Sequence, residues 1–375
     1  MQTRAAILRA MGLPPPYAQS RPLAVETVDL DPPGPGEVLV RIKAAGLCHS
    51  DLSVINGDRP RPVPMVLGHE AAGTVEALGA GVEDLKAGDH VVMVFVPSCG
   101  HCLPCAEGRP ALCEPAMAAN TAGTLLSGAR RLKHNGGVLN HLLGVAAFAD
   151  YVTVSRRSLI RVDKSLPFEH AALFGCAVLT GVGAVVNTAA LKPGQTAAIV
   201  GLGGVGLAGL LGAVAAGASQ IIAIDVMAGK LELARKLGAT TTVNGRDADA
   251  IEQVKAATGG GVDFAFDFAG SVQALETAWR VTRRGGTTVS AGLPNPKLTF
   301  PLPAVNLVAE ERTLKGSYIG TCVPLRDIPR YVALFQQGKL PVDKLLTGRL
   351  ALEDINEGFD RLHRGEAIRQ IVTFP

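Results

Sequence analysis

The chain has 375 residues, of which 47% are hydrophobic and 18% charged, and its 36 basic and 33 acidic side chains leave a formal net charge of +3. This composition is typical of a globular α/β enzyme and excludes disordered and fibrous chains, while the near-neutral balance argues against nucleic acid as a partner. A chain of this length favours two domains.

The N-terminal sequence MQTRAAILRAMGLPPPY predicts no export signal, because its apolar run is short and contains an arginine. Seven cysteines without such a signal predict a reducing, cytoplasmic environment, where disulfides are not expected. Cys322 stands apart from the other cysteines, and we expect it to be a small buried side chain.

The first part of the chain predicts short β-strands. Residues 37–43, 73–78 and 88–94 alternate between apolar and polar side chains or follow a turn signal. The frequent glycines and prolines between these runs are typical of a compact, barrel-like β domain.

Residues 99–113, CGHCLPCAEGRPALC, hold four cysteines in a segment too short to have a core of its own. The thiolates of this segment match a tetrahedral zinc site, and the ligands would be Cys99, Cys102, Cys105 and Cys113. A low-potential iron–sulfur cluster is the competing interpretation, but it would need an electron partner that the sequence does not indicate. Zinc with four sulfur ligands has no open position, so we predict a structural zinc lobe over 97–115 and seek a catalytic metal elsewhere.

Residues 114–140 predict a long irregular segment with a basic patch at 130–133. Such a segment is either a functional or interface loop or a solvated excursion of the chain.

From about Phe168 the sequence changes to strands that alternate with helices, which indicates βαβ units and a parallel sheet. The expected strands are 197–200, 220–225, 262–268 and 287–291, and the expected helices include 230–237 and 272–281. Residues 196–218 are uncharged and long enough to span a bilayer, but we interpret them as a buried strand, a turn and a buried helix. The tail from about Gly320 is expected to rejoin the first domain.

A dinucleotide-binding fingerprint occupies residues 201–206, GLGGVG, between a predicted strand and a predicted helix. Gly201 would allow the tight turn, Gly203 the approach of the pyrophosphate, and Gly206 the close packing of helix and strand. The helix N-terminus would present free N–H groups to the phosphates. Asp225 ends the next strand, where a carboxylate accepts hydrogen bonds from a ribose diol and repels a 2′-phosphate, so NAD is favoured over NADP.

Three further residues are candidates for a catalytic metal: Cys48 in GLCHSD, His69 in GHEAAG and Cys176 in LFGCAV. Each alone is equally consistent with an ordinary buried thiol or core histidine. Together with the four-cysteine segment, the glycine fingerprint and the closing sequence GEAIRQIVTF, they resemble the zinc-dependent medium-chain alcohol dehydrogenase family over essentially the whole chain.

The resemblance implies a GroES-like catalytic domain over 1–177 and 320–375 and a Rossmann coenzyme domain over 178–319. It implies two Zn(II) ions per chain, one structural and one catalytic, and NAD as the coenzyme. The catalytic zinc would be held by Cys48, His69 and Cys176. Asp51 would orient the imidazole of His69, and Glu70 would lie behind the metal and assist ligand exchange.

The resemblance also implies a proton relay, in which Ser50 accepts the alcohol proton and passes it to the ribose hydroxyl. Ser53 stands where known members have a histidine that ends the relay, so the last step is expected to pass through Ser53 and water. His49 stands where several relatives have an arginine, and it is expected to hold the pyrophosphate more weakly. The remaining expected coenzyme contacts are Gly204, Val205, Lys230 and Arg369.

The positions that match the family's substrate pocket are Ser50, Phe95, Leu142, Leu143, Leu293 and Ile319. Such an apolar lining with one hydroxyl favours primary aliphatic or aromatic alcohols and their aldehydes. Two alternatives remain: a glutathione-dependent formaldehyde dehydrogenase, and a non-catalytic protein that binds zinc or nucleotide. We expect a homodimer or homotetramer formed through an edge strand near 304–319, with no nucleic acid or membrane partner.

Overall fold

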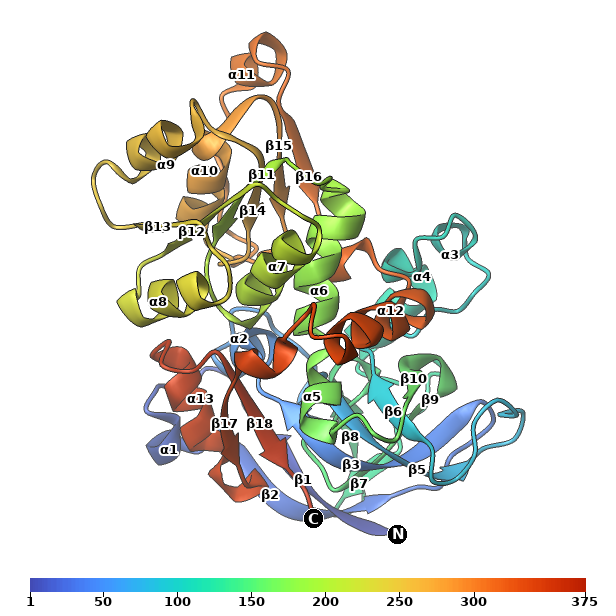
Figure 1. Cartoon of the computed structure of the whole chain (residues 1–375). Coiled ribbons are helices and arrows are strands. Elements are labelled where there is room, and N and C mark those ends of the chain that lie inside the picture. The colour runs from blue at the N-terminus through green and yellow to red at the C-terminus, as the bar shows by residue number, and fades with distance from the viewer. The chain divides into compact units, whose positions relative to one another are not determined.

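The computed structural model describes residues 1–375 and divides into two compact units, which Figure 1 shows with their helices and strands labelled. Unit 1 comprises residues 1–176, 323–332 and 346–375, and unit 2 comprises residues 177–322 and 333–345. Residues 333–345, which we expected in the catalytic domain, group with unit 2. The physical reason is that their apolar side chains Leu340, Val342 and Leu345 are fully buried, and the turn over Val342–Leu345 packs on helix α7 (Gly204–Ala215).

Unit 1 contains a closed barrel and a larger sheet, which confirms the predicted β-rich domain. The barrel strands are, in order, β1 (Gln2–Leu8), β2 (Leu23–Leu30), β7 (Leu132–His134), β8 (Gly137–His141) and β4 (Met65–Val66). The larger sheet has the order β10 (Leu159–Val162), β6 (His90–Met93), β5 (Ala71–Leu78), β3 (Glu37–Gly46), β18 (Arg369–Thr373) and β17 (Leu346–Leu350), and β9 (Tyr151–Ser155) pairs with β3.

Strand β3 shows why this sequence forms the larger sheet. Val38, Val40 and Ile42 are fully buried, whereas the alternate residues Arg41 and Lys43 remain partly exposed. This period of two presents one face to the core and the other to solvent. The strand continues to Gly46, past the predicted end at 43, because β18 from the end of the chain pairs with residues 44–46.

The helices of unit 1 are short and connect the strands. They are α1 (Tyr17–Ser20), α2 (His49–Ile55), α3 (Leu103–Ala106), α4 (Glu114–Ala122), α5 (Phe168–Leu173) and α13 (Ile355–His363), and α12 (Pro324–Gln336) begins in unit 1 and ends in unit 2.

The prediction of an irregular segment over 114–140 is wrong. This segment forms helix α4 and the barrel strands β7 and β8. Its basic patch is held by charge pairing, since Arg131 Nε lies 2.7 Å from Glu37 Oε2 and Lys133 Nζ lies 2.8 Å from Asp31 Oδ2. These pairs join residues about a hundred positions apart, which local sequence patterns do not reveal.

Unit 2 is a six-stranded parallel sheet with helices between its strands, which confirms the Rossmann fold. The strand order is β13 (Thr241–Asn244), β12 (Gln220–Asp225), β11 (Thr196–Val200), β14 (Val262–Asp267), β15 (Thr282–Ser290) and β16 (Thr313–Gly316). Besides α7, its helices are α6 (Ala177–Gly183), α8 (Ala228–Lys236), α9 (Ala250–Thr258), α10 (Val272–Val281) and α11 (Ala304–Ala309). The chain moves outward from β11 in one direction and then from β14 in the other, so the topological switch point lies between these two strands.

Residues 196–218 form strand β11, the glycine turn and helix α7, as predicted. No helix of the structure combines the length and the apolar character that crossing a bilayer requires. Cys322 is fully buried, which confirms its predicted role as a small core side chain, and its Sγ donates to the carbonyl of Leu179.

The edge of the parallel sheet differs from the prediction. Only Thr313–Gly316 forms a strand, β16, whereas Ala304–Ala309 forms helix α11. Pro301 and Pro303, directly before helix α11, lack the N–H groups that pairing in a sheet needs. They therefore disfavour a strand in this segment. All four residues of β16 are exposed.

Candidate active site

Unit 1 brings together three residues that are far apart in the sequence. Cys48 immediately precedes helix α2, His69 lies between strands β4 and β5, and Cys176 follows helix α5. Their ligand atoms all lie within 4.8 Å of one another, and all three side chains are buried. Cys176 Sγ lies 3.5 Å from His69 Nε2.

This geometry fits a zinc ion. Two ligand atoms bound to one tetrahedral zinc at about 2.0–2.3 Å stand about 3.5–3.8 Å apart. The sulfur–nitrogen distance of 3.5 Å meets that condition without rearrangement. Two sulfurs and one imidazole leave the fourth coordination position of the ion to water or substrate, as a catalytic site requires.

Asp51 fixes the orientation of the His69 imidazole. Its Oδ2 atom lies 3.2 Å from His69 Nδ1, and its Oδ1 atom accepts a hydrogen bond from the backbone N–H of Gly68 at 2.9 Å. The contact with Nδ1 directs Nε2 toward the two sulfurs. Gly68 has a φ of +91°, and a Cβ atom there would lie 2.6 Å from the backbone nitrogen of Phe148, so only glycine fits beside the ligand.

The electrostatics of the three ligands favour a bound cation. A hydrogen bond from Cys176 holds the pKa of Cys48 well below its ordinary value and correspondingly raises the pKa of Cys176. Burial alone would lower the pKa of His69, but the charges of Asp51 and Cys48 outweigh burial and raise it well above its ordinary value. The negative charges of Asp51 and Cys48 thus lie in a buried position, where a dication would neutralise them.

Arg369 is buried close to the ligands. It is 4% exposed, donates to the carbonyl of Leu47 at 3.1 Å, and has Nη1 3.7 Å from Glu70 Oε2. Burial would lower its pKa, but the negative charges of Glu70, Cys48 and Cys176 raise it above the ordinary value. Glu70 and Arg369 therefore form a buried charge pair next to the metal ligands.

The residues of the predicted proton relay lie on helix α2, directly after Cys48. Ser50 is partly exposed on the first turn of this helix. The Ser53 hydroxyl donates to the backbone carbonyl of His49 at 2.8 Å, one turn earlier. This bond engages the proton of Ser53, but the two lone pairs of its oxygen remain able to accept.

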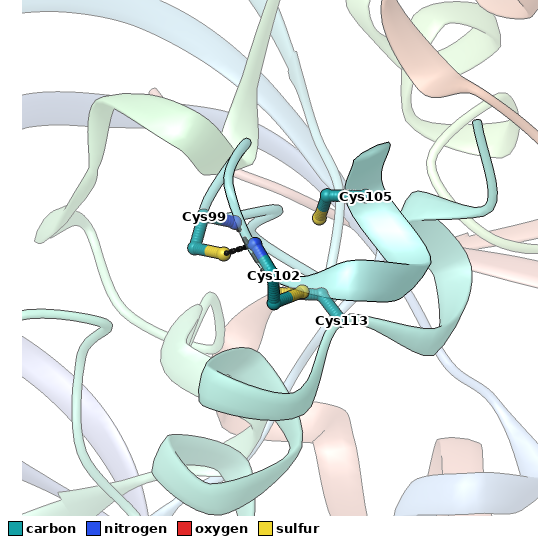
Figure 2. A group of neighbouring side chains, drawn as sticks. All are labelled: Cys99, Cys102, Cys105 and Cys113. Atoms are coloured by element: carbon teal, nitrogen blue, oxygen red, sulfur yellow. Dashed lines mark hydrogen bonds between the residues drawn. The ribbon is translucent and has the colours of Figure 1, made fainter. Parts of the chain in front are cut away.

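The four cysteines of the predicted structural site also converge (Figure 2). Their sulfur atoms all lie within 4.8 Å of one another, and all seven cysteines of the chain are free, which excludes a disulfide framework. The lobe consists of the four-residue helix α3, a 3₁₀ turn over Pro110–Leu112, and loops. Helix α3 buries none of its residues and the following turn buries Pro110 and Ala111, so this segment has only a small apolar core.

Backbone N–H groups of the lobe point at its sulfur atoms. The N–H of Cys99 donates to Cys113 Sγ at 3.2 Å, and the N–H of Cys102 donates to Cys99 Sγ at 3.3 Å. Although desolvation acts in the opposite direction, hydrogen bonds from the backbone of His101 and Cys102 lower the pKa of Cys99 to about 6. Such bonds stabilise thiolates and are typical of the surroundings of metal-bound sulfur.

The glycine loop of unit 2 gives each glycine the environment expected from its spacing. Gly201 has a φ of +88°, and a Cβ atom on Gly206 would lie 1.8 Å from the carbonyl oxygen of Gly201. A Cβ atom on Gly203 would meet nothing within 4 Å, which leaves its surface open to a ligand. The loop lies at the carboxyl end of β11, at the switch point of the sheet, and the N-terminus of α7 follows it.

Asp225 lies at the end of β12, beside this loop. Its two carboxylate oxygens accept from the backbone N–H groups of Leu202 at 2.7 Å and Met227 at 2.9 Å. Each oxygen retains a further lone pair for a ribose hydroxyl. Lys230 is partly exposed on the first turn of α8.

The predicted pocket residues are divided between the two units. Ser50, Phe95, Leu142 and Leu143 belong to unit 1, whereas Leu293 and Ile319 belong to unit 2. In unit 1 the ring of Phe95 packs edge-on against His69, with ring centroids 5.2 Å apart and an interplanar angle of 86°. Phe95 therefore lies directly beside a metal ligand.

Sequence reasoning missed Asn120, a buried polar residue on helix α4 that contacts the backbone of Phe95. No motif marks this position, and the surrounding segment was expected to be irregular. A buried asparagine seven residues after a cysteine ligand carries no recognisable pattern.

Comparison with known proteins identifies the family. The model of the alcohol dehydrogenase GroES-like domain matches residues 34–164, and the model of the zinc-binding dehydrogenase domain matches residues 204–337. The chain belongs to the zinc-dependent medium-chain alcohol dehydrogenase family. It is therefore an oxidoreductase that acts on alcohols.

Relatives of this dehydrogenase match over nearly their whole length. An NDMA-dependent alcohol dehydrogenase of Amycolatopsis methanolica is 39% identical over 376 residues, with 99% of each chain covered. An alcohol dehydrogenase class-3 of Drosophila melanogaster is 38% identical over 364 residues, with 96% of each chain covered. Among solved structures, benzyl alcohol dehydrogenase from Acinetobacter calcoaceticus has a TM-score of 0.93 and 32% identity, with 100% of each chain covered.

Proposed function

We propose that this dehydrogenase oxidises primary aliphatic or aromatic alcohols reversibly to aldehydes with NAD as the hydride acceptor. The observation that carries the proposal is the buried set of Cys48, His69 and Cys176, whose ligand atoms meet within 4.8 Å. Two sulfurs and one nitrogen leave an open coordination position, which distinguishes this set from the closed four-cysteine lobe. We propose one zinc ion at each set.

The residues of the chain have distinct tasks in this reaction. Zinc, when bound, supplies a Lewis acid that makes the alcohol proton acidic near neutral pH. Asp51 holds His69 in the orientation in which its Nε2 faces the sulfurs. Ser50 would accept the proton from the alcohol oxygen, a ribose hydroxyl of the coenzyme would carry it onward, and Ser53 with water would receive it. NAD, when bound, would supply the nicotinamide ring that accepts the hydride from the carbinol carbon.

NAD is the proposed coenzyme because of the charge at Asp225. A carboxylate with both oxygens directed at backbone N–H groups stays in place beside the glycine loop, where a 2′-phosphate would meet its negative charge. Lys230, His49 and Arg369 are proposed to contact the adenosine ribose and the pyrophosphate.

The proposed substrate class is supported by the buried apolar side chains Phe95, Leu142 and Leu143 of unit 1. A structural neighbour at 32% identity is named benzyl alcohol dehydrogenase, which is consistent with an aromatic substrate. The glutathione-dependent oxidation of formaldehyde is the second candidate reaction.

A panel of alcohols tests the proposal directly. We expect zinc-loaded protein to reduce free NAD with benzyl alcohol and with aliphatic primary alcohols, and kcat/KM with NADP to be lower by at least about tenfold. The measurement is the formation of NADH with ethanol, hexanol, benzyl alcohol and a polyol. Sorbitol should give no signal because the pocket positions lack several polar groups.

Two parallel reactions define the outcomes that contradict the proposal. Turnover of formaldehyde only when glutathione is present would establish the second candidate. Because one relative is named NDMA-dependent, a reaction with NDMA and no free NAD is also included. Alcohol oxidation that requires NDMA and ignores added NAD would overturn the assignment of NAD as a free coenzyme, and absence of all turnover would leave a non-catalytic binding protein.

We also propose that the protein acts in the cytoplasm as a homodimer or a tetramer of two dimers, joined through the sheet edge of unit 2. The four residues of β16 are exposed, and Val305 and Val308 on the adjacent helix α11 are 70% and 81% exposed. A strand edge with free backbone groups beside two exposed valines is typical of a surface that pairs with a second copy.

Charged substitutions in α11 test this interface. The double variant Val305→Asp, Val308→Asp is expected to shift the protein from dimer to monomer at micromolar concentration, because each carboxylate would lose water on association. The measurement is molar mass by light scattering. Val138→Asp in strand β8 is a matched control at a 52% exposed valine of unit 1 and should leave the mass unchanged. A wild-type protein that is monomeric throughout would contradict the proposal.

A further inference from the structure

Asn120 occupies an unusual position for a polar side chain. It lies near the end of helix α4 and is only 4% exposed. Its side-chain amide Nδ2 donates a hydrogen bond to the backbone carbonyl of Phe95 at 2.9 Å. Because a carbonyl oxygen only accepts, this bond defines which end of the amide faces Phe95.

The other end of the same amide faces a second segment of the predicted pocket. Asn120 Oδ1 is buried, accepts no hydrogen bond from the protein, and would lie 3.7 Å from a Cβ atom placed on Gly144. Helix α4 packs against the turn over Leu142–Gly144, in which Leu143 has a φ of +52°. The side chain of Asn120 is therefore inserted between the backbone of Phe95 and the strained turn that carries Leu142 and Leu143.

Phe95 transmits this contact to the metal site. Its ring lies edge-on against His69, 5.2 Å between ring centroids, so a displacement of its backbone moves the ring beside a metal ligand. Phe95 is 8% exposed and its carbonyl is engaged by Asn120, so removal of the amide would leave a buried acceptor without this donor.

We propose that Asn120 is a positioning residue that determines alcohol specificity by holding Phe95 and the turn at Leu142–Gly144 at a defined separation. The inference rests on the proposed function in one respect, that Phe95 and the two leucines line the alcohol pocket. Asn120 itself contacts neither the metal ligands nor the reacting atoms in this account. It acts through Phe95 and through the turn at Leu142–Gly144.

The same helix connects this role to the cysteine lobe. Cys113 immediately precedes α4, and Cys99 follows Phe95 by four residues. The lobe thus lies on the chain between the two residues that the hydrogen bond joins. A metal that holds Cys99 and Cys113 together would therefore also keep Phe95 and Asn120 at a fixed separation.

The first test measures specificity. For Asn120→Ala we expect the ratio of kcat/KM for benzyl alcohol to kcat/KM for ethanol to change by about tenfold, because a displaced ring no longer matches one substrate size. The control Thr121→Ala changes the next residue, whose exposed hydroxyl bonds only to the carbonyl of Met117, and should leave the ratio unchanged. In the Phe95→Ala background the substitution of Asn120 should have a smaller effect on the ratio, because only the turn at Leu142–Gly144 then remains to be displaced. An equal effect in both backgrounds would show that Asn120 does not act through Phe95 and would overturn the proposal.

The second test does not depend on turnover. The zinc-loaded full-length chain, labelled with 4-fluorophenylalanine at position 95, is compared with and without Asn120→Ala by ¹⁹F NMR. We expect the resonance to shift or broaden in Asn120→Ala and in the apolar variant Asn120→Leu, and to stay unchanged in Thr121→Ala. An unchanged resonance in correctly folded Asn120 variants would overturn the proposal. If the resonance moves while no alcohol is oxidised, the proposed function fails and the positioning of Phe95 stands.

Discussion

The substitution Cys176→Ser is expected to remove the zinc of the three-residue site and to lower kcat/KM for alcohol oxidation by about a thousandfold, or about 4 kcal/mol of transition-state stabilisation. A hydroxyl is a much poorer zinc ligand than a thiolate, while its size preserves the packing around a side chain that is 5% exposed. The expected zinc content falls from two ions per chain to one, because the four-cysteine lobe is unaffected.

A matched control exists in the same chain. Cys322 is also fully buried, but its Sγ donates to the carbonyl of Leu179 and it belongs to neither group of metal-binding residues. Cys322→Ser should therefore retain two zinc ions and wild-type turnover. Metal analysis and steady-state kinetics on both variants decide the matter. Full activity of Cys176→Ser with one zinc remaining would show that the three-residue site is not catalytic.

Sequence reasoning is most successful for residues that lie close together in the chain, because their spacing along one turn limits the positions that they can take. Gly201 makes the tight turn, Gly203 has an open surface, and Gly206 lies in close contact with the carbonyl of Gly201, as their spacing predicts. The spacing is informative because all three glycines lie on one short turn. The four cysteines of the lobe also converge within one short segment, which helix α3 and the 3₁₀ turn over Pro110–Leu112 fold back on itself. Local chain geometry determines both sites.

The features that sequence reasoning missed depend on contacts between distant segments. Residues 114–140 seemed irregular in the sequence but contribute two strands to the barrel. The charge pair of Arg131 with Glu37, 94 positions earlier, stabilises this arrangement. Arg369 was expected as a coenzyme contact, but its burial beside Glu70, 299 positions earlier in the chain, was not foreseen. The convergence of Cys48, His69 and Cys176 is likewise non-local, and only the resemblance to a known family indicated it. No motif of the family includes Asn120, so the sequence did not indicate its role.

Removal of one ligand from the lobe is expected to have the second large effect, on stability. Cys105→Ser should release the lobe zinc and leave residues 97–115 without regular structure. The reason is that the lobe has only a small apolar core: the four-residue helix α3 buries none of its residues, and the following turn buries only Pro110 and Ala111. A segment of this kind draws its folding free energy from the metal itself.

The expected magnitude is a decrease in Tm of about 10 °C, which corresponds to about 3 kcal/mol for a chain of two medium-sized domains. Hydrogen exchange read out by mass spectrometry should show lost protection over 97–115 and over helix α4, and unchanged protection in the parallel sheet of unit 2. The substitution Cys322→Ser again serves as the control for loss of a thiol. Iron rather than zinc in the wild-type lobe would support the competing cluster interpretation.

Catalysis should also respond to Cys105→Ser, although the lobe has no open coordination position. Cys99 and Cys113 lie on the chain between Phe95 and Asn120, and loss of the lobe metal would release both cysteines. Phe95 and helix α4 could then move apart, which would break the hydrogen bond from Asn120 to the carbonyl of Phe95. We therefore expect Cys105→Ser to reproduce the altered ratio of benzyl alcohol to ethanol turnover seen with Asn120→Ala, with the zinc at Cys48, His69 and Cys176 still present. An intact ratio in a variant that has lost only the lobe zinc would separate the two sites and limit the lobe to a role in stability.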